Sequence, residues 1–216
     1  MNKWKSLEEI KSFFKDGMRI MVGGFLTCGT PEKLIDMVVE SGVKDLTIIC
    51  NDAGYPDKGV GKLLNSNQVK KLIVTHIGTN PNAGKLMSEG KIEVELIPQG
   101  TFIEQIRAYG GRLGGVLTPT GLHTPVEEGK RIIDINGQSY LLYEPLGADI
   151  SLINAYHADP LGNLTYKGSA RNFNPMMAVA SEKVIALVHE KVVDIDPEVV
   201  ITPHIFVDVL VEVNHG

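Results

Sequence analysis

A glycine-rich segment in the first quarter of the chain is the first candidate for chemistry. Residues 23–29 read Gly-Gly-Phe-Leu-Thr-Cys-Gly and lie between an apolar run and Thr30-Pro31-Glu32, which suits the start of a helix. Glycines let the backbone approach a ligand closely, and unpaired N–H groups at such a turn can face an oxyanion or a phosphate. The segment lacks both the GK[ST] ending of a P-loop and the spacing GxGxxG. A tight structural turn explains it equally well.

Glu104 is the most promising carboxylate for general acid/base or nucleophilic work. It follows Thr101 by three residues, shortly after Gln99-Gly100. The same spacing forms a capping box, in which Thr101 caps a helix and Glu104 occupies its third position. We favour the capping box over a catalytic role, because this local pattern is common at helix starts.

The thiols and imidazoles give weaker signals. Cys28 lies inside the glycine segment near an expected helix start, a place that favours a thiolate nucleophile. No histidine lies close to it in sequence, so a small apolar filler is the preferred interpretation. The histidines show neither the i, i+4 spacing nor the HExxH pattern of metal ligands, and we expect no metal. They are His76, His123, His157, His189, His204 and His215.

Composition narrows the class of protein. The chain has 216 residues, of which 43% are hydrophobic, and this predicts a single domain over residues 1–216. The net charge is −5 and no basic stripe occurs, so we expect no nucleic-acid partner. Cys28 and Cys50 are isolated, which indicates a reducing compartment. With no secretory signal and no apolar stretch of about 18 residues, the prediction is a cytoplasmic protein without a membrane partner.

Short apolar runs alternate with amphipathic segments through most of the chain. This alternation favours an α/β fold with an open, largely parallel sheet and helices on both faces. Expected strands cover residues 18–22, 46–50, 72–77, 92–97, 150–156 and 184–188, and expected helices cover 6–14, 30–42, 86–90, 101–109 and 175–181.

A β-hairpin excursion interrupts this order. The runs 131–135 and 139–143 flank Asn136-Gly137, a pair that tolerates the positive φ angles of a type I′ turn. Residues 199–213 are apolar and β-branched, and they predict a strand or a docking segment.

Several segments together resemble the alpha subunit of class I CoA-transferases of the acetate or butyrate–acetoacetate type. The resemblance extends from about residue 7 to residue 188, and its strength comes from the order and coverage of motifs that are weak individually. They are MVGGFLTCGTPEKLID at 21–36, HIGTNP at 76–81, PQGTFIEQIR at 98–107, DPLGNLTY at 159–166 and ARNFNP at 170–175.

The resemblance implies a ping-pong reaction that moves CoA between a short-chain acyl-CoA and a free acid such as acetate, butyrate or acetoacetate. CoA and acyl-CoA would be substrates, with no permanently bound cofactor. The family's nucleophilic glutamate lies in an S-E-N-G motif of the beta subunit, and this chain has no such motif. We therefore expect no catalytic residue here and an α2β2 or larger assembly.

The resemblance also assigns roles within the glycine segment. It implies an oxyanion site at Gly23, Gly24 and Phe25. It implies CoA contacts over the whole segment, namely Gly23, Gly24, Phe25, Leu26, Thr27, Cys28 and Gly29.

Other interpretations remain open. One is a stand-alone acyl-CoA hydrolase or isomerase-type enzyme that uses Glu104, and another is a non-catalytic CoA-binding module. Tyr109 and Arg112 stand where relatives carry small residues. They are either surface variants, which we favour, or part of an acyl pocket.

Overall fold

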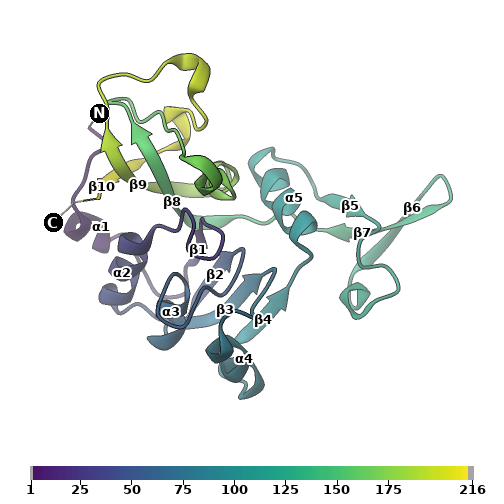
Figure 1. Cartoon of the computed structure of the whole chain (residues 1–216). Helices are drawn as coiled ribbons and strands as arrows, with labels where there is room; N and C mark the ends of the chain where they lie inside the picture. The colour runs from purple at the N-terminus through teal and green to yellow at the C-terminus, as the bar shows by residue number, and fades with distance from the viewer. Residues whose placement is uncertain (1, 214–216) are drawn as a thin grey trace.

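A computed structural model describes residues 2–213, so His215 lies outside the described residues. Its centre is a seven-stranded sheet in the order β10-β9-β8-β1-β2-β3-β4 (Figure 1). Every neighbouring pair in it is parallel, which confirms the predicted α/β class. The strands are β1 (Arg19–Val22), β2 (Leu46–Cys50), β3 (Val69–Val74), β4 (Glu93–Leu96), β8 (Ala148–Ala158), β9 (Ser181–Lys191) and β10 (Val209–Glu212).

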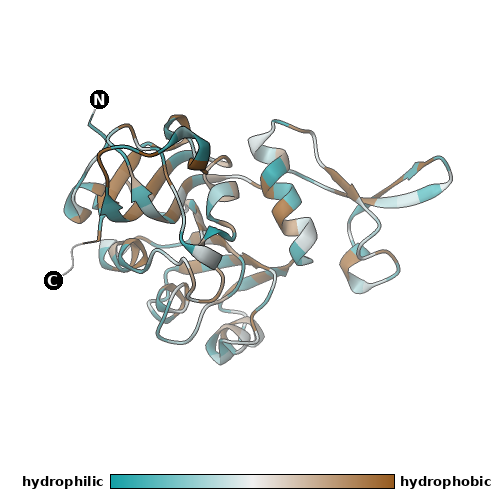
Figure 2. Ribbon diagram, turned by 45° about the horizontal axis from the view of Figure 1, so that its top comes forward, coloured by the Kyte–Doolittle hydropathy of each residue, from teal (hydrophilic) through white to brown (hydrophobic). Residues whose placement is uncertain are grey.

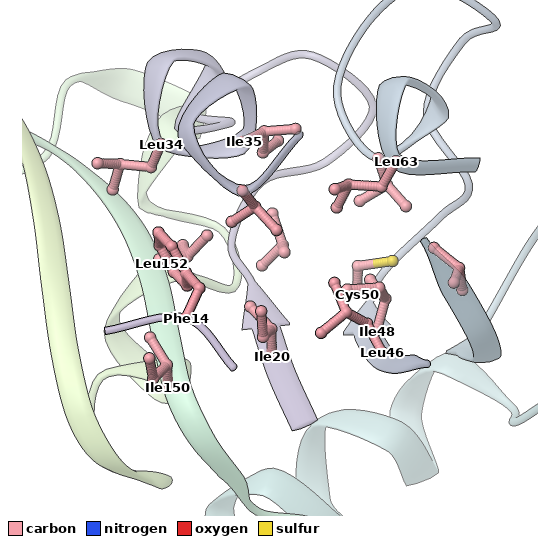
Figure 3. Close-up of a cluster of buried hydrophobic side chains, with 14 of the residues drawn as sticks. Phe14, Ile20, Leu34, Ile35, Leu46, Ile48, Cys50, Leu63, Ile150 and Leu152 are labelled. Carbon is pink, nitrogen blue, oxygen red and sulfur yellow. The ribbon is translucent and has the colours of Figure 1, made fainter. Parts of the chain in front are cut away.

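The sheet is buried on both faces, as continuous apolar strands require. In β1, Ile20 and Val22 enter one hydrophobic core while Met21 enters the other. Figure 3 shows the first core, and Figure 2 shows hydrophobic colour along the strands of the sheet. Helices α1 (Leu7–Lys11), α2 (Glu32–Ser41), α3 (Gly61–Asn65) and α4 (Pro81–Ser88) cover the first face, and α5 (Gln99–Gly110) and α6 (Asn174–Met177) cover the second.

The predicted hairpin is confirmed. Strands β6 (Arg131–Ile135) and β7 (Gln138–Tyr143) pair antiparallel, and Asn136 and Gly137 have φ angles of 53° and 79°. The sequence pattern missed β5 (Val116–Thr118), which pairs with β7 to complete a three-stranded sheet. This small sheet stands away from the main one, beyond α5 (Figure 1).

Several predicted helix starts are wrong. Thr30 does not cap α2, because its Oγ1 donates a hydrogen bond to the Leu26 carbonyl oxygen at 3.0 Å and Pro31 precedes the helix. Helix α4 begins five residues before the predicted start at residue 86, because Asn80 caps it and Pro81 opens it. Helix α3 was not predicted; it begins at Gly61, where we expected a glycine-rich loop to end.

The C-terminal prediction is confirmed in part. Only β10 at its end is a strand, and it pairs with β9. Before it the chain makes the short turns η3 (Pro197–Val199) and η4 (His204–Phe206), and two similar turns elsewhere are η1 (Pro125–Glu127) and η2 (Gly168–Arg171). Within residues 2–213, no helix is both long enough and apolar enough to span a membrane.

Candidate functional site

The carboxyl ends of the parallel strands meet at one edge of the sheet, the usual place for a site in an open α/β fold. The glycine segment 23–29 directly follows β1, and Asn51 and Asp52 directly follow β2. Thr75 follows β3, and Gln99 lies in the first turn of α5, after β4. The fold therefore brings together polar residues that are up to 76 positions apart in sequence.

The glycine segment forms a tight turn that is tied to the sheet. The N–H of Gly23 donates to the Leu152 carbonyl oxygen at 2.9 Å, which continues the pairing of β1 with β8. Phe25 and Cys28 exchange backbone hydrogen bonds of 3.0 and 2.9 Å. Leu26, between them, has a φ of 55°. These backbone hydrogen bonds define the conformation of the segment.

Two positions of the turn require glycine for different reasons. A Cβ on Gly23 would lie 1.9 Å from the Asn174 Oδ1 atom. Gly24 has a φ of 116°, and its Cβ would lie 2.2 Å from the Thr30 Oγ1 atom. The backbone therefore packs directly against neighbouring polar side chains, which leaves no room for larger residues.

Asn174 fastens the turn to the rest of the molecule. Its fully buried side chain accepts a hydrogen bond from the Asn154 N–H at 3.0 Å. Its Nδ2 donates to the carbonyl oxygens of Gly29 at 3.0 Å and Ala170 at 2.8 Å. Asn172 adds a bond from Nδ2 to the Cys28 carbonyl oxygen at 3.0 Å. The ARNFNP motif carries both asparagines, but the sequence alone gave them no role.

Asp52 fastens the turn from the other side. Its Oδ2 accepts from the Leu26 N–H at 2.7 Å and from Asn51 Nδ2 at 2.8 Å, while Oδ1 accepts from the Gly54 N–H at 2.9 Å. The carboxylate is buried, so these donors replace its hydration. Burial, with the nearby Asp52 charge, raises the pKa of the Cys50 thiol. Sequence reasoning missed Asp52, and its place just after a buried strand was the available signal.

A second polar cluster lies beside this anchor. The Gln99 Nε2 donates to the Asn51 Oδ1 at 2.7 Å, and the Thr75 Oγ1 donates to the Asn51 carbonyl oxygen at 2.8 Å. Asn51 is buried, whereas Gln99 is exposed. The carboxyl edge therefore presents amide groups next to the glycine turn.

The N–H groups of the turn divide into paired and unpaired donors. Those of Gly23, Phe25, Leu26 and Cys28 donate to protein oxygens. Within residues 2–213, no oxygen accepts from the N–H groups of Gly24, Thr27 or Gly29. Of the three residues expected at an oxyanion site, only Gly24, which is itself buried, therefore has an unpaired N–H.

The other candidate residues have structural environments. Helix α5 begins at Gln99 after Pro98, so Thr101 is buried inside it and the predicted capping box does not form. Glu104 instead pairs with Arg107 at 3.0 Å, with 47% of its side chain exposed. Cys28 is an exposed thiol whose Sγ lies 3.1 Å from the Ser169 Oγ. In the described part of the chain, no three His, Cys, Asp or Glu side chains group as metal ligands would.

The two residues that depart from the family pattern lie at the end of α5. Tyr109 packs its ring against Gly147, where a Cβ would lie 2.2 Å from the ring. Arg112 is exposed, with a φ of 55° just after the helix. Neither residue contacts the glycine turn through a hydrogen bond among the described residues.

Comparison with known proteins assigns the chain to a family. The profile of the coenzyme A transferase family matches residues 5–213. The chain belongs to the coenzyme A transferase family. This confirms the resemblance seen in the sequence and, with it, the enzyme class.

Two CoA-transferase relatives match over nearly their full length. The acetoacetyl-CoA:acetate/butyrate CoA transferase alpha subunit of Clostridium acetobutylicum is 52% identical over 207 residues, covering 95% of both chains. The acetate CoA-transferase subunit alpha of Escherichia coli strain K12 is 49% identical over 208 residues, covering 95% of this chain and 94% of the relative.

Solved structures share the CoA-transferase fold at low identity. The acyl-CoA transferase YdiF from Escherichia coli O157:H7 has a TM-score of 0.90 and 22% identity. The match covers 98% of this chain but only 47% of the YdiF chain, so this chain spans about half of that protein. Glutaconate coenzyme A-transferase from Acidaminococcus fermentans has a TM-score of 0.84 at 20% identity, covering 97% of this chain and 75% of that one.

Proposed function

We propose that this chain is the alpha subunit of a CoA-transferase that moves CoA between a short-chain acyl-CoA and a free carboxylic acid. Acetoacetyl-, butyryl- and acetyl-CoA are the proposed donors, which follows the names of the two relatives described above. The observation that carries the proposal is the glycine turn at the carboxyl edge. Asn174 and Asp52 hold it rigid, and it keeps an unpaired N–H at Gly24.

The nucleophile in this proposal is a glutamate of a beta subunit. Its carboxylate attacks the thioester carbonyl, which forms an acyl-glutamyl anhydride and releases the CoA thiolate. The thiolate then attacks the glutamyl carbonyl, giving a glutamyl-CoA thioester and the first free acid. A second carboxylate reverses both steps and leaves as its CoA thioester, which gives ping-pong kinetics.

Each of these steps passes through a tetrahedral oxyanion, and the chain supplies its stabilisation. We assign the Gly24 N–H as the donor within the expected Gly23-Gly24-Phe25 site, because the N–H groups of Gly23 and Phe25 already donate elsewhere. One preorganised donor contributes about 3 kcal/mol to such a transition state. The fixed conformation of the turn supports this role, since the donor needs no reorganisation during the reaction.

The turn also supplies the proposed CoA contacts over residues 23–29. Phe25, Thr27 and Cys28 are its exposed members, so they can meet a ligand without rearrangement. CoA and acyl-CoA act as substrates, with no permanently bound cofactor. Residues 1–216 form one alpha-subunit domain in an α2β2 or larger assembly, and the free thiols Cys28 and Cys50 support a cytoplasmic location.

The geometry gives no support to a stand-alone enzyme based on Glu104. That carboxylate is about half exposed and its side chain is bonded to Arg107, so it lacks the buried environment that prepares a catalytic carboxylate. A non-catalytic CoA-binding module makes a different prediction from a transferase subunit. It would bind CoA but would never support transfer.

Reconstitution tests the proposal. The chain and its candidate beta subunit are purified apart, then assayed separately and mixed for transfer of CoA from acetoacetyl-CoA to butyrate. The proposal expects transfer only in the mixture. Robust transfer by this chain alone, or none in a stable complex with the beta subunit, would contradict it.

A further inference from the structure

One face of the main sheet changes character at the carboxyl ends of β8 and β9. Side chains on one face of a strand recur every second residue. Leu152 in β8 and Leu187 in β9 belong to the apolar core beneath α1 and α2. The next residues on this face are Asn154 and Tyr156 in β8, and His189 in β9. The change from apolar to polar side chains occurs where the buried core ends.

The polar end of this face opens into a pocket beside the glycine turn. The pocket has a volume of about 400 Å³, which is within the range of small-molecule sites. The turn forms one wall, the strand ends form the floor, and the segment before η2 forms the rim. The residues that line it include Thr27, Gly29, Asn154, Tyr156, Lys167 and His189.

The floor of the pocket holds a buried amide with an unused donor. Asn154 is only 7% exposed, and its Oδ1 lies 3.1 Å from the His189 Nε2. No acceptor for the Asn154 Nδ2 occurs in the part of the chain that the structure describes. The Nδ2 atom is not among the fully buried side-chain atoms that lack a partner in the described chain, so it is accessible and can donate to a ligand in the pocket. Asn154 therefore marks the floor as a binding surface.

The wall and the rim add further donors. The unpaired N–H groups of Thr27 and Gly29 belong to residues that line the pocket. At the rim, the exposed Lys167 Nζ lies 4.6 Å from the centre of the Tyr156 ring and 3.4 Å from its hydroxyl. Donors from three segments of the chain thus surround one volume.

The carboxylate that follows His189 in β9 is already engaged. Glu190 accepts from the Tyr156 hydroxyl at 2.9 Å and lies 3.2 Å from the His157 Nε2. The hydrogen bond from Tyr156, with that from His157, lowers the pKa of Glu190, so the group stays ionised and bound to these partners. Glu190 does not line the pocket.

We propose that this pocket binds an anionic oxygen group of a transferase substrate, either a phosphate of CoA or the carboxylate of the free acid. An ammonium group, an amide N–H and backbone N–H groups are the donors that oxyanions of both kinds accept. The pocket adjoins the turn that we assign to CoA contacts, so one ligand can reach both. This inference rests on the proposed function, since it names a subsite of that same site.

The test compares Lys167→Met with the wild type in the reconstituted two-subunit enzyme. The variant removes the one Lys or Arg among the described residues that line the pocket, and because Lys167 is exposed we expect the fold to be retained. The expected result is a roughly tenfold rise in KM for one of the two substrates, with kcat within about twofold. Lys167→Arg, which keeps the charge, should restore KM to within about threefold. Lys85→Met, on the exposed surface of α4, is the matched control and should match the wild type.

The two sources of the anion give different results. A phosphate in the pocket predicts a raised KM for acyl-CoA, and the difference between variant and wild type should shrink with 3′-dephospho-CoA if the 3′-phosphate is bound. A carboxylate predicts a raised KM for butyrate instead. Calorimetric titration of CoA and of butyrate into the reconstituted enzyme checks the same difference without turnover. If neither ligand distinguishes Lys167→Met from the wild type in either assay, the subsite is overturned while transfer by the wild type still supports the proposed function.

Discussion

Among single residues, Asn174 has the widest reach. Its carboxamide joins β8, the glycine turn and η2 through the Asn154 N–H and the carbonyl oxygens of Gly29 and Ala170. Gly29 and Asn174 are 145 residues apart in sequence. The position of the glycine turn therefore depends on a side chain that is distant in sequence.

Asn174→Ala should loosen the turn. The change leaves the buried Asn154 N–H without its acceptor, and such losses cost about 1–3 kcal/mol each. We expect the free energy of unfolding to fall by about 3 kcal/mol in urea titrations and the reconstituted activity to fall about 100-fold, since small displacements of positioned groups are costly. Asn172→Ala, which removes a more exposed bond, should cost about 1 kcal/mol. Equal stability of Asn174→Ala and the wild type would contradict this assignment.

Gly24→Ala should affect turnover more than stability. The added Cβ would lie 2.2 Å from the Thr30 Oγ1, and a φ of 116° is strained for alanine. The backbone must therefore shift, and the N–H of residue 24 moves with it. We predict a loss of about 100-fold in kcat in the reconstituted enzyme. Gly42→Ala is the control, because Gly42 also has a positive φ, of 70°, but nothing lies near its Cβ. That variant should lose about 1 kcal/mol of stability and no activity. Similar kcat values for both variants would count against the donor role of Gly24.

Local sequence rules failed at two helix starts, where another local arrangement of the chain replaced the expected cap. Thr30 fits a helix N-cap by type and position, but its hydroxyl bonds within the turn to the Leu26 carbonyl oxygen. Thr101 and Glu104 fit a capping box, but α5 begins earlier and buries Thr101. The need for glycine in the turn was predictable from the sequence. The identities of its anchors, Asp52 and Asn174, were not, because they depend on tertiary packing.

At the scale of elements, the turn after β8 is organised around the Asp159 carboxylate. Asp159 accepts from the N–H groups of Leu161, Gly162 and Asn163, and from the Asn163 side chain at 2.7 Å. Burial alone would raise the pKa of Asp159, but these hydrogen bonds outweigh it and lower that pKa below its ordinary value. The ionised form is thus the one that the fold stabilises.

Asp159→Asn should give a stability difference that depends on pH. A folded pKa below the unfolded value, near 3.9, means that the contribution is present above that pH and is lost as pH falls through the folded pKa. We expect the variant to be about 2 kcal/mol less stable than the wild type at pH 7. In denaturant titrations, the difference in free energy of unfolding between the variant and the wild type should become smaller below about pH 4. A gap that is constant from pH 7 to pH 3 would contradict the charge-based account.

Elements with a strong local signal were predicted well. The pair Asn136-Gly137 between two strand-like runs predicted the hairpin correctly. The apolar runs around Ile48 and Ile185 predicted buried strands correctly. Strand β5 has three residues and is defined only by its pairing with β7, so no local pattern marks it. Helix α3 begins at Gly61, a residue that usually indicates a loop.

At the scale of the whole molecule, the parallel sheet gathers the candidate site residues at its carboxyl edge. In our proposal, that site still lacks the nucleophile. Its carboxyl edge collects a rigid backbone turn, buried amides and a pocket with unused donors. In our proposal these groups bind and stabilise negative charge, and among residues 2–213 none of the candidate nucleophiles lies in an environment that would activate it. Cys28 is exposed beside Ser169, and Glu104 is paired with Arg107. A nucleophile from a second chain would complete the reaction.

The most direct test of this division of labour is the location of the covalent intermediate. The reconstituted enzyme is incubated with acetoacetyl-CoA without an acceptor acid, trapped, digested and mapped by mass spectrometry. The account predicts a CoA-derived modification on one glutamate of the beta subunit and none on this chain. A modification on Glu104, or on any other carboxylate of this chain, would contradict it.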